Sequence, residues 1–167
     1  MLTLKPFSGE DAKRVREFLK ASAYDEPHIT EVSPTGIPPS LRPCDLESYE
    51  DRLGNWSPFH CLAKWFFLGY PVPSESALKV VPDWFVELSV GHGLLEQPES
   101  LIVPLVLVVP CENMWITSDL HQQRRSDGAS DHILPLNRPA RHLCHFLLRD
   151  PAEDGLDLCS GNGLHAM

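Results

Sequence analysis

The sequence lacks a long uninterrupted run of apolar residues. Its longest apolar stretch, residues 101–109, contains Pro104 and is far too short to span a bilayer. Residues 1–20 carry charge throughout and have no apolar run before a small-residue cleavage site, so no secretory signal is visible. We therefore expect a cytoplasmic protein that does not use the membrane as a partner.

Basic residues are scarce relative to acidic ones. The chain has 14 Lys and Arg against 23 Asp and Glu, which gives a formal net charge of −9. Loose binding to phosphate backbones requires many phosphates to be neutralised, so this balance disfavours it and leaves only a local basic patch open. Arg124, Arg125, Arg138 and Arg141 have acidic neighbours, and we expect them on a solvated surface.

Paired cysteines at metal-ligand or redox spacing are also missing. The five cysteines are scattered and odd in number, which is typical of a reduced cytosolic protein: Cys44, Cys61, Cys111, Cys144 and Cys159. His142 and His145 flank one of these cysteines, and His60 precedes another, but no second pair shows zinc-finger spacing. We expect no metal site and no Cys/His nucleophile pair.

Against these absences, 43% of the 167 residues are hydrophobic, enough to bury a core without covalent staples. Residues 8–21 predict a helix, because Ser8 is a suitable N-cap, Asp11 follows it as a capping-box acid and apolar residues share one face. Residues 25–45 are rich in proline and predict an extended connector.

Further helices are predicted before residue 93. Ser57-Pro58 opens one that ends at Gly69 and is apolar on more than one face. Ser74 caps a short helix at 75–80, and residues 82–90 form another that ends at Gly91-His92-Gly93. The tryptophans of the chain are expected to be core or interface residues: Trp56, Trp65, Trp84 and Trp115.

Residues 101–109 and 114–117 are apolar and β-branched and predict a β-hairpin with its turn at 110–113. Three or four short helices followed by a hairpin is the order of a winged-helix-like module. We therefore predict an α+β, winged-helix-like domain over 1–120 that serves substrate recognition. The polar residues 121–130 are expected to form a linker.

Residues 131–167 have a different pattern. Residues 139–149 predict an amphipathic helix, and an apolar strand at 156–159 leads into small residues and a helix start at 164–166. This order is the first βα unit of an α/β, Rossmann-like domain. Gly161 and Gly163 allow a sharp bend and close approach of a ligand, and Asp157 can hold a carboxylate near a cationic group such as an ammonium.

The run Asp157 to Gly163 resembles motif I of class I S-adenosylmethionine-dependent methyltransferases, with Cys159 where the first glycine of the turn usually lies. Residues 134–139 resemble the segment before motif I in glutamine-amide and adenine-amino methyltransferases. The order of a small helical domain with a wing, a strand end at Ser118-Asp119-Leu120, the run at 131–134 and then motif I is similar to bacterial methyltransferases of that subgroup. The resemblance implies S-adenosylmethionine as cofactor and the following cofactor-binding residues: Asn137, Arg138, Asp157, Cys159, Ser160, Gly161, Asn162 and Gly163.

The resemblance further implies methyl transfer to a nitrogen of nucleic acid or protein, with the acceptor left open among RNA, DNA, protein glutamine and a small molecule. The family's Asn-Pro-Pro-aromatic motif and its ribose-binding acid do not occur, so catalytic residues are expected beyond residue 167 and the fragment alone is expected to be inactive. Other α/β nucleotide folds stay open. So do a winged-helix interaction or nucleic-acid-binding module without catalysis, and a truncated product without activity.

Overall fold

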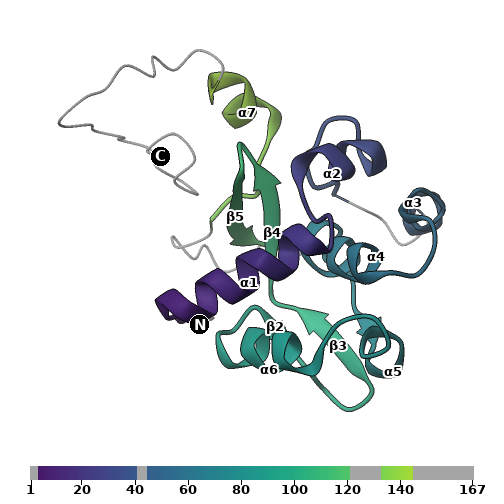
Figure 1. Cartoon of the computed structure of the whole chain (residues 1–167). Coiled ribbons are helices and arrows are strands. Elements are labelled where there is room, and N and C mark those ends of the chain that lie inside the picture. Colours follow the sequence, from purple (N-terminus) through teal and green to yellow (C-terminus); the bar gives the residue numbers. More distant parts are fainter. Residues whose placement is uncertain (1–3, 41–44, 121–132, 145–167) are drawn as a thin grey trace, which may run out of the picture.

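The computed structural model describes residues 4–40, 45–120 and 133–144. These residues form a mixed α+β arrangement with two small antiparallel sheets (Figure 1). In chain order the elements are α1 (Gly9–Ala21), α2 (Glu26–Val32), α3 (Leu46–Leu53), α4 (Pro58–Leu62), the π-helical turn η2 (Ala63–Phe67), β1 (Val72–Pro73), α5 (Ser74–Ala77), α6 (Asp83–Gly91), β2 (Leu95–Glu96), β3 (Leu101–Pro104), β4 (Val106–Cys111), β5 (Met114–Asp119) and α7 (Arg138–Cys144).

Helix α1 confirms the first predicted helix. The Ser8 hydroxyl oxygen accepts the N–H of Asp11 at 3.1 Å, as a capping residue should. Val15 and Leu19 are buried on the inner side of the helix. The local signals in this segment were therefore sufficient to place it.

The predicted extended connector at 25–45 is wrong where α2 forms. Asp25 caps this helix by accepting the N–H of His28 at 3.1 Å, and Pro27 lies in its first turn, where a missing N–H costs nothing. Ile29 and Val32 are buried. The prolines marked a helix start here, and α3 follows as a further helix that the sequence pattern did not reveal.

The helix that begins at Pro58 is confirmed and is central. Ser57 caps it, since its hydroxyl accepts the N–H of His60 at 3.2 Å. The helix continues into η2, which contacts both β3 and β4. Gly69 ends it with φ +74°, and the Leu120 side chain lies 3.2 Å from where a Cβ would stand. The positive φ therefore favours glycine at this position, and an added Cβ would also require the Leu120 side chain to move by a few tenths of an ångström.

The next two helices differ in how well they were predicted. Ser74 was expected to cap its helix, but it is the first helical residue, Pro73 precedes it, and its hydroxyl has no partner within the part of the chain described. Helix α6 follows the prediction closely. It begins after Pro82 and is followed by Gly93 in left-handed conformation, φ +81°.

The strands divide the apolar run that was predicted as one strand. β3 pairs with β1 and β2 in a sheet of order β1–β3–β2, whereas β4 pairs only with β5. Leu105 separates β3 from β4. The hairpin of β4 and β5 is confirmed, with Glu112 and Asn113 as its turn residues. Both have positive φ, 51° and 65°, as type I′ turns require.

One continuous core joins the helices to both sheets. The indole of Trp65 is fully buried and donates to the carbonyl of Ile102 at 3.2 Å. The buried hydroxyl of Tyr24 donates to the carbonyl of Val108 at 2.7 Å. Trp84 and Trp115 pack partly against the core, whereas Trp56 is 38% exposed, so of the two expected positions, core or interface, the core is wrong for Trp56.

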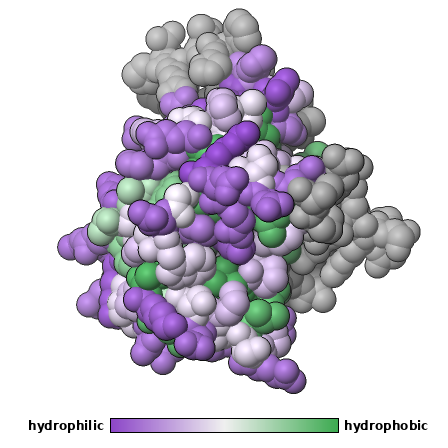
Figure 2. Space-filling model, turned by 90° about the vertical axis from the view of Figure 1, so that its right-hand side faces the viewer, coloured by the Kyte–Doolittle hydropathy of each residue, from purple (hydrophilic) through white to green (hydrophobic). Residues whose placement is uncertain are grey.

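The surface seen from the side of α3 and α5 is mainly hydrophilic, with hydrophobic residues in small separate areas (Figure 2). Among residues 4–40, 45–120 and 133–144, no helix combines the length and the apolarity needed to cross a membrane. The predicted linker at 121–130 and the predicted strand and glycine turn at 156–163 lie outside the described residues.

Candidate functional site

Two of the predicted cofactor-binding residues, Asn137 and Arg138, lie where α7 begins. The carboxamide oxygen of Asn137 accepts the N–H of Ala140 at 2.9 Å, and its backbone carbonyl accepts the N–H of Arg141 at 3.0 Å. Asn137 is therefore the N-cap of α7. Arg138 is exposed beside it. Asp157 and the other predicted residues up to Gly163 lie outside the described residues.

The segment before α7 is held against β5. The N–H of Asp119 donates to the carbonyl of Ile133 at 3.1 Å, and the N–H of Ile133 donates to the Asp119 carboxylate at 2.7 Å. Leu136 is buried in the core. The chain therefore passes beside the C-terminal end of β5 before it enters α7.

Arg141 anchors α7 to the α2 region. Its guanidinium forms an ion pair with the Glu26 carboxylate and donates to the carbonyl of Thr35 at 3.0 Å. A Cβ on Gly36, which has φ +58°, would collide with that guanidinium. The Arg141 side chain is only 21% exposed, so the expected solvated position is wrong for this residue. No local signal connects residues this far apart in sequence.

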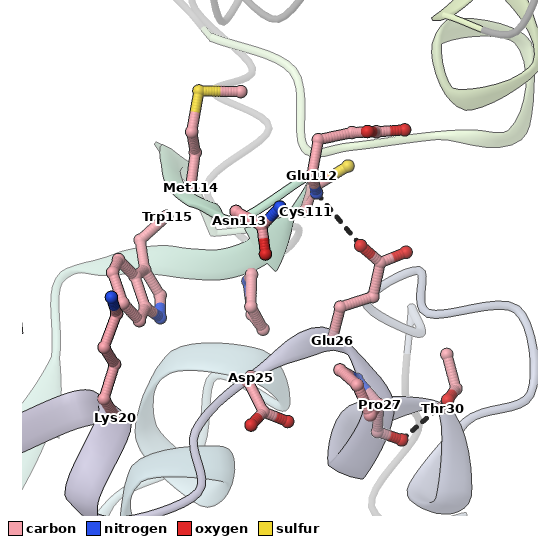
Figure 3. A pocket seen from close by; sticks show the side chains of 11 residues that line it. Lys20, Asp25, Glu26, Pro27, Thr30, Cys111, Glu112, Asn113, Met114 and Trp115 are labelled. Atoms are coloured by element: carbon pink, nitrogen blue, oxygen red, sulfur yellow. Dashed lines mark hydrogen bonds between the residues drawn. The ribbon is translucent and has the colours of Figure 1, made fainter.

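The other Glu26 carboxylate oxygen accepts the N–H of Glu112 at 2.9 Å. Glu26 thus joins α7 to the turn of the β4–β5 hairpin, and it also lines an open pocket of about 650 Å³ between α2 and that turn. Lys20 and Asp25 line the same pocket, and Figure 3 shows Lys20 beside the Trp115 ring.

Most polar side chains that line this pocket already form hydrogen bonds with other residues of the protein. One Asp25 carboxylate oxygen accepts from His28, Thr30 donates to the carbonyl of Pro27 at 2.7 Å, and the Trp115 indole donates to the carbonyl of Tyr24 at 2.9 Å. This arrangement supplies shape and charge for binding.

A second charged cluster connects α3 with α4 and η2. Nε2 of His60 lies 2.9 Å from the Glu50 carboxylate, which also forms an ion pair with Lys64. Nδ1 of His60 lies 3.3 Å from the carbonyl of Gly54. Trp56 packs on this ring with centroids 4.6 Å apart. His60 is 5% exposed, whereas the Glu50 side chain is 31% exposed, so the cluster lies at the edge of the core.

The ionisation of this cluster follows from its contacts. Burial raises the pKa of the Glu50 carboxyl, but the hydrogen bonds and charges of Lys64 and His60 outweigh it and hold that pKa below its usual range. Burial raises the pKa of the neighbouring Cys61 thiol to about 12, despite the charge of Lys64. The thiol therefore stays protonated and is a poor nucleophile.

Within the described ranges, no group of three His, Cys, Asp or Glu side chains is arranged to hold a metal ion. Comparisons of the chain with protein-family models, with curated proteins and with solved structures give no match. The function must therefore be inferred from the chain's own motifs, from the anchoring of α7 and from the surfaces of the two sheets.

Proposed function

We propose that the chain is the N-terminal part of a class I S-adenosylmethionine-dependent methyltransferase that methylates a nitrogen acceptor. The observation that carries this proposal is the sequence pattern at 156–166, which predicts a strand, a glycine turn and a helix start, with Asp157 at the end of the predicted strand. The cofactor's methionine half would lie over the backbone of 159–163. Asp157 would accept a charge-assisted hydrogen bond from its ammonium group.

The anchoring of α7 supports this proposal. Helix α7 is the last described element before the glycine turn, and it is held at Asn137 by its cap and at Arg141 by Glu26. The segment that leads to the cofactor turn thus starts from a fixed point on the N-terminal unit. Methyl transfer depends mainly on the alignment of the cofactor with the methyl acceptor. An anchored α7 would help to position the cofactor-binding segment relative to the N-terminal unit.

The topology of residues 58–104 supports a winged-helix-like recognition unit. A helix (α4 with η2) is followed by the short strand β1, by the consecutive helices α5 and α6, and by the hairpin β2–β3, whose second strand pairs with β1. In this proposal the wing is the β2–β3 connection, whereas the sequence pattern had suggested the later hairpin.

The same topology favours a second function, a winged-helix binding module without catalysis. The two differ in the role of the glycine turn. A methyltransferase binds S-adenosylmethionine through Asp157 and its neighbours, whereas a binding module has no use for that cofactor.

Titration calorimetry of the full-length protein with S-adenosylmethionine tests the proposal. We expect saturable binding, weakened by about tenfold or more in Asp157→Ala, because a charge-assisted hydrogen bond contributes about 1.5–3 kcal/mol. The matched control is Asp154→Ala, an acid just outside the motif, which should leave the affinity unchanged. Absence of binding by the wild type, or equal affinities for wild type and Asp157→Ala, would contradict the proposal.

A further inference from the structure

The segment that contains α7 is attached to the N-terminal unit at two separate places. The first is Leu136, which is 1% exposed in the core, with the contacts between Asp119 and Ile133 beside it. The second is Arg141, further along the chain, whose guanidinium contacts α2 and the loop after it. The two attachments differ in kind, because one is apolar and the other is ionic.

Between and beyond these places, α7 contributes little apolar burial. Among its described side chains, at 138–142, those of Arg138, Pro139 and His142 are exposed and Ala140 packs only partly against the core. Figure 1 shows α7 beyond one end of the β4–β5 hairpin. Isolated helices shorter than about 12–15 residues are marginal in water, so a seven-residue helix depends on its contacts with the rest of the protein.

The carboxylate that holds Arg141 is shared between two elements. One oxygen of Glu26 pairs with Arg141, and the other accepts the N–H of Glu112 at 2.9 Å. The Glu26 side chain is 28% exposed and the Arg141 side chain is 21% exposed, so water and dissolved ions reach this pair. Added salt weakens ion pairs of this exposure. The ionic attachment is therefore sensitive to salt, whereas the burial of Leu136 does not depend on charge.

The loop after α2 leaves space for the guanidinium. Thr35 offers its carbonyl at 3.0 Å, and the next residue, Gly36, has no Cβ to collide with the Arg141 side chain. The planar guanidinium donates to this carbonyl and to Glu26 from different nitrogens. Because both contacts require one orientation of the side chain, the docked α7 has a definite position.

We propose that α7 is held by a salt-sensitive latch, made of Arg141, Glu26 and the carbonyl of Thr35, and that it opens locally while both sheets stay folded. When Arg141 leaves Glu26, α7 turns about the buried Leu136 and loses its helical hydrogen bonds. The chain continues from α7, so the latch determines whether it leaves the N-terminal unit from a fixed or a free point. This proposal does not depend on methyl transfer.

Native-state hydrogen exchange of the full chain, followed by mass spectrometry, tests this proposal. The exchange rates of α7 and of β4 are measured at several urea concentrations below the unfolding transition, and at low and high salt. The informative variant is Arg141→Gln. Its matched control is Arg16→Gln, an exposed cation of α1 whose loss changes the net charge equally. Glu26→Gln and its control Glu31→Gln, both in α2, test the other half of the latch.

In the wild type we expect α7 to exchange faster than β4 and almost independently of urea, because a local opening exposes little surface. Exchange in α7 should rise by about threefold or more between about 0.05 M and 0.5 M NaCl. Arg141→Gln and Glu26→Gln should each speed α7 exchange by about tenfold, as expected for loss of a charged hydrogen bond, and should remove its dependence on salt.

Three results would overturn the proposal. If α7 and β4 had the same dependence on urea in the wild type, α7 would open only with the whole fold. If Arg141→Gln left α7 exchange unchanged, or if Arg16→Gln accelerated it equally, the latch would not hold this helix. If the salt dependence of α7 exchange persisted in Arg141→Gln, it would arise from other charges.

Discussion

Residues up to Lys79 and residues from Val80 to Leu120 differ in their charged side chains and in where these side chains lie. In the first region a partly buried ionic cluster joins Glu50 to His60 and Lys64 and so connects α3 to the central helix. The second region has acids but no Lys or Arg at all, and its carboxylates on α6 and the β2–β3 connection are exposed. The first region therefore includes one ionic cluster within its packing, beside exposed pairs such as Lys13 with Glu17, whereas the acids of α6 and the β2–β3 connection lie at the surface.

The second region gains its stability from apolar burial instead. Every residue of β4 is buried, because this strand lies between β5, η2 and α2. The β2–β3 hairpin, by contrast, has a two-residue strand and an exposed acidic turn. We call the β4–β5 hairpin the framework hairpin, because its first strand is wholly buried, whereas the β2–β3 hairpin ends in an exposed turn. The following predictions test this division.

The largest effect is expected in the framework hairpin. Leu107→Ala in β4 should lower the free energy of unfolding by about 2–5 kcal/mol, because the side chain is 1% exposed and its removal leaves a cavity. Leu101→Ala, at 39% exposure in β3, should cost about 0.5 kcal/mol or less. Urea unfolding followed by tryptophan fluorescence measures both. Similar losses at the two positions would remove the distinction between the hairpins.

An intermediate effect is expected where the first region holds α7. Gly36→Ala should cost about 1–3 kcal/mol, because the left-handed backbone disfavours a Cβ and that Cβ would displace Arg141 from Glu26. Gly9→Ala is the control, since no atom lies within 4 Å of its added Cβ. Urea unfolding gives both values, and hydrogen exchange should show faster exchange in α7 for Gly36→Ala only. Unchanged exchange in α7 would show that Arg141 does not hold this helix.

The smallest effect concerns acid stability. The pKa of Glu50 is lower in the folded chain than in the unfolded one, so its contribution is complete above about pH 4.5 and is lost as pH falls through the folded value. Glu50→Gln should therefore cost about 1 kcal/mol at neutral pH and reduce the loss of stability between neutral and acidic pH. Glu87→Gln, on exposed α6, should leave the neutral value and the acid slope unchanged.

Urea midpoints measured at several pH values provide these slopes. Parallel slopes for the wild type and Glu50→Gln would mean that the cluster does not couple folding to protonation. A loss of slope in Glu87→Gln would mean that the exposed acids also act on stability.

The parts of the fold that the sequence predicted are those with complete local signals. Ser8 with Asp11, Ser57 with Pro58, and the glycines after α6 placed three helices, because caps and stops act within a few residues. Asp25 and Pro27 carried the same kind of signal for α2, but the prolines around them suggested an extended chain. The local helix-start signal was therefore present in α2, but the high proline content of residues 25–45 led to the prediction of an extended connector.

Other features depend on contacts between distant residues. The apolar run from Leu101 to Val109 shows no break in hydrophobicity, so nothing local indicates that it serves two sheets. The ion pair of Arg141 with Glu26 joins residues 115 positions apart. Of the predicted cofactor-binding residues, the structure describes only Asn137 and Arg138, which lie together because they are neighbours in the sequence. The capping role of Asn137 follows from its position before a helix.

The buried thiols of Cys61 and Cys111 make the core accessible to a chemical measurement of its opening. A thiol that is covered reacts with an alkylating reagent only while its surroundings are open. Cys61 is on the central helix and Cys111 is at the end of β4. With the remaining cysteines replaced by serine, the two alkylation rates report separately how often the helical half and the framework hairpin open under native conditions.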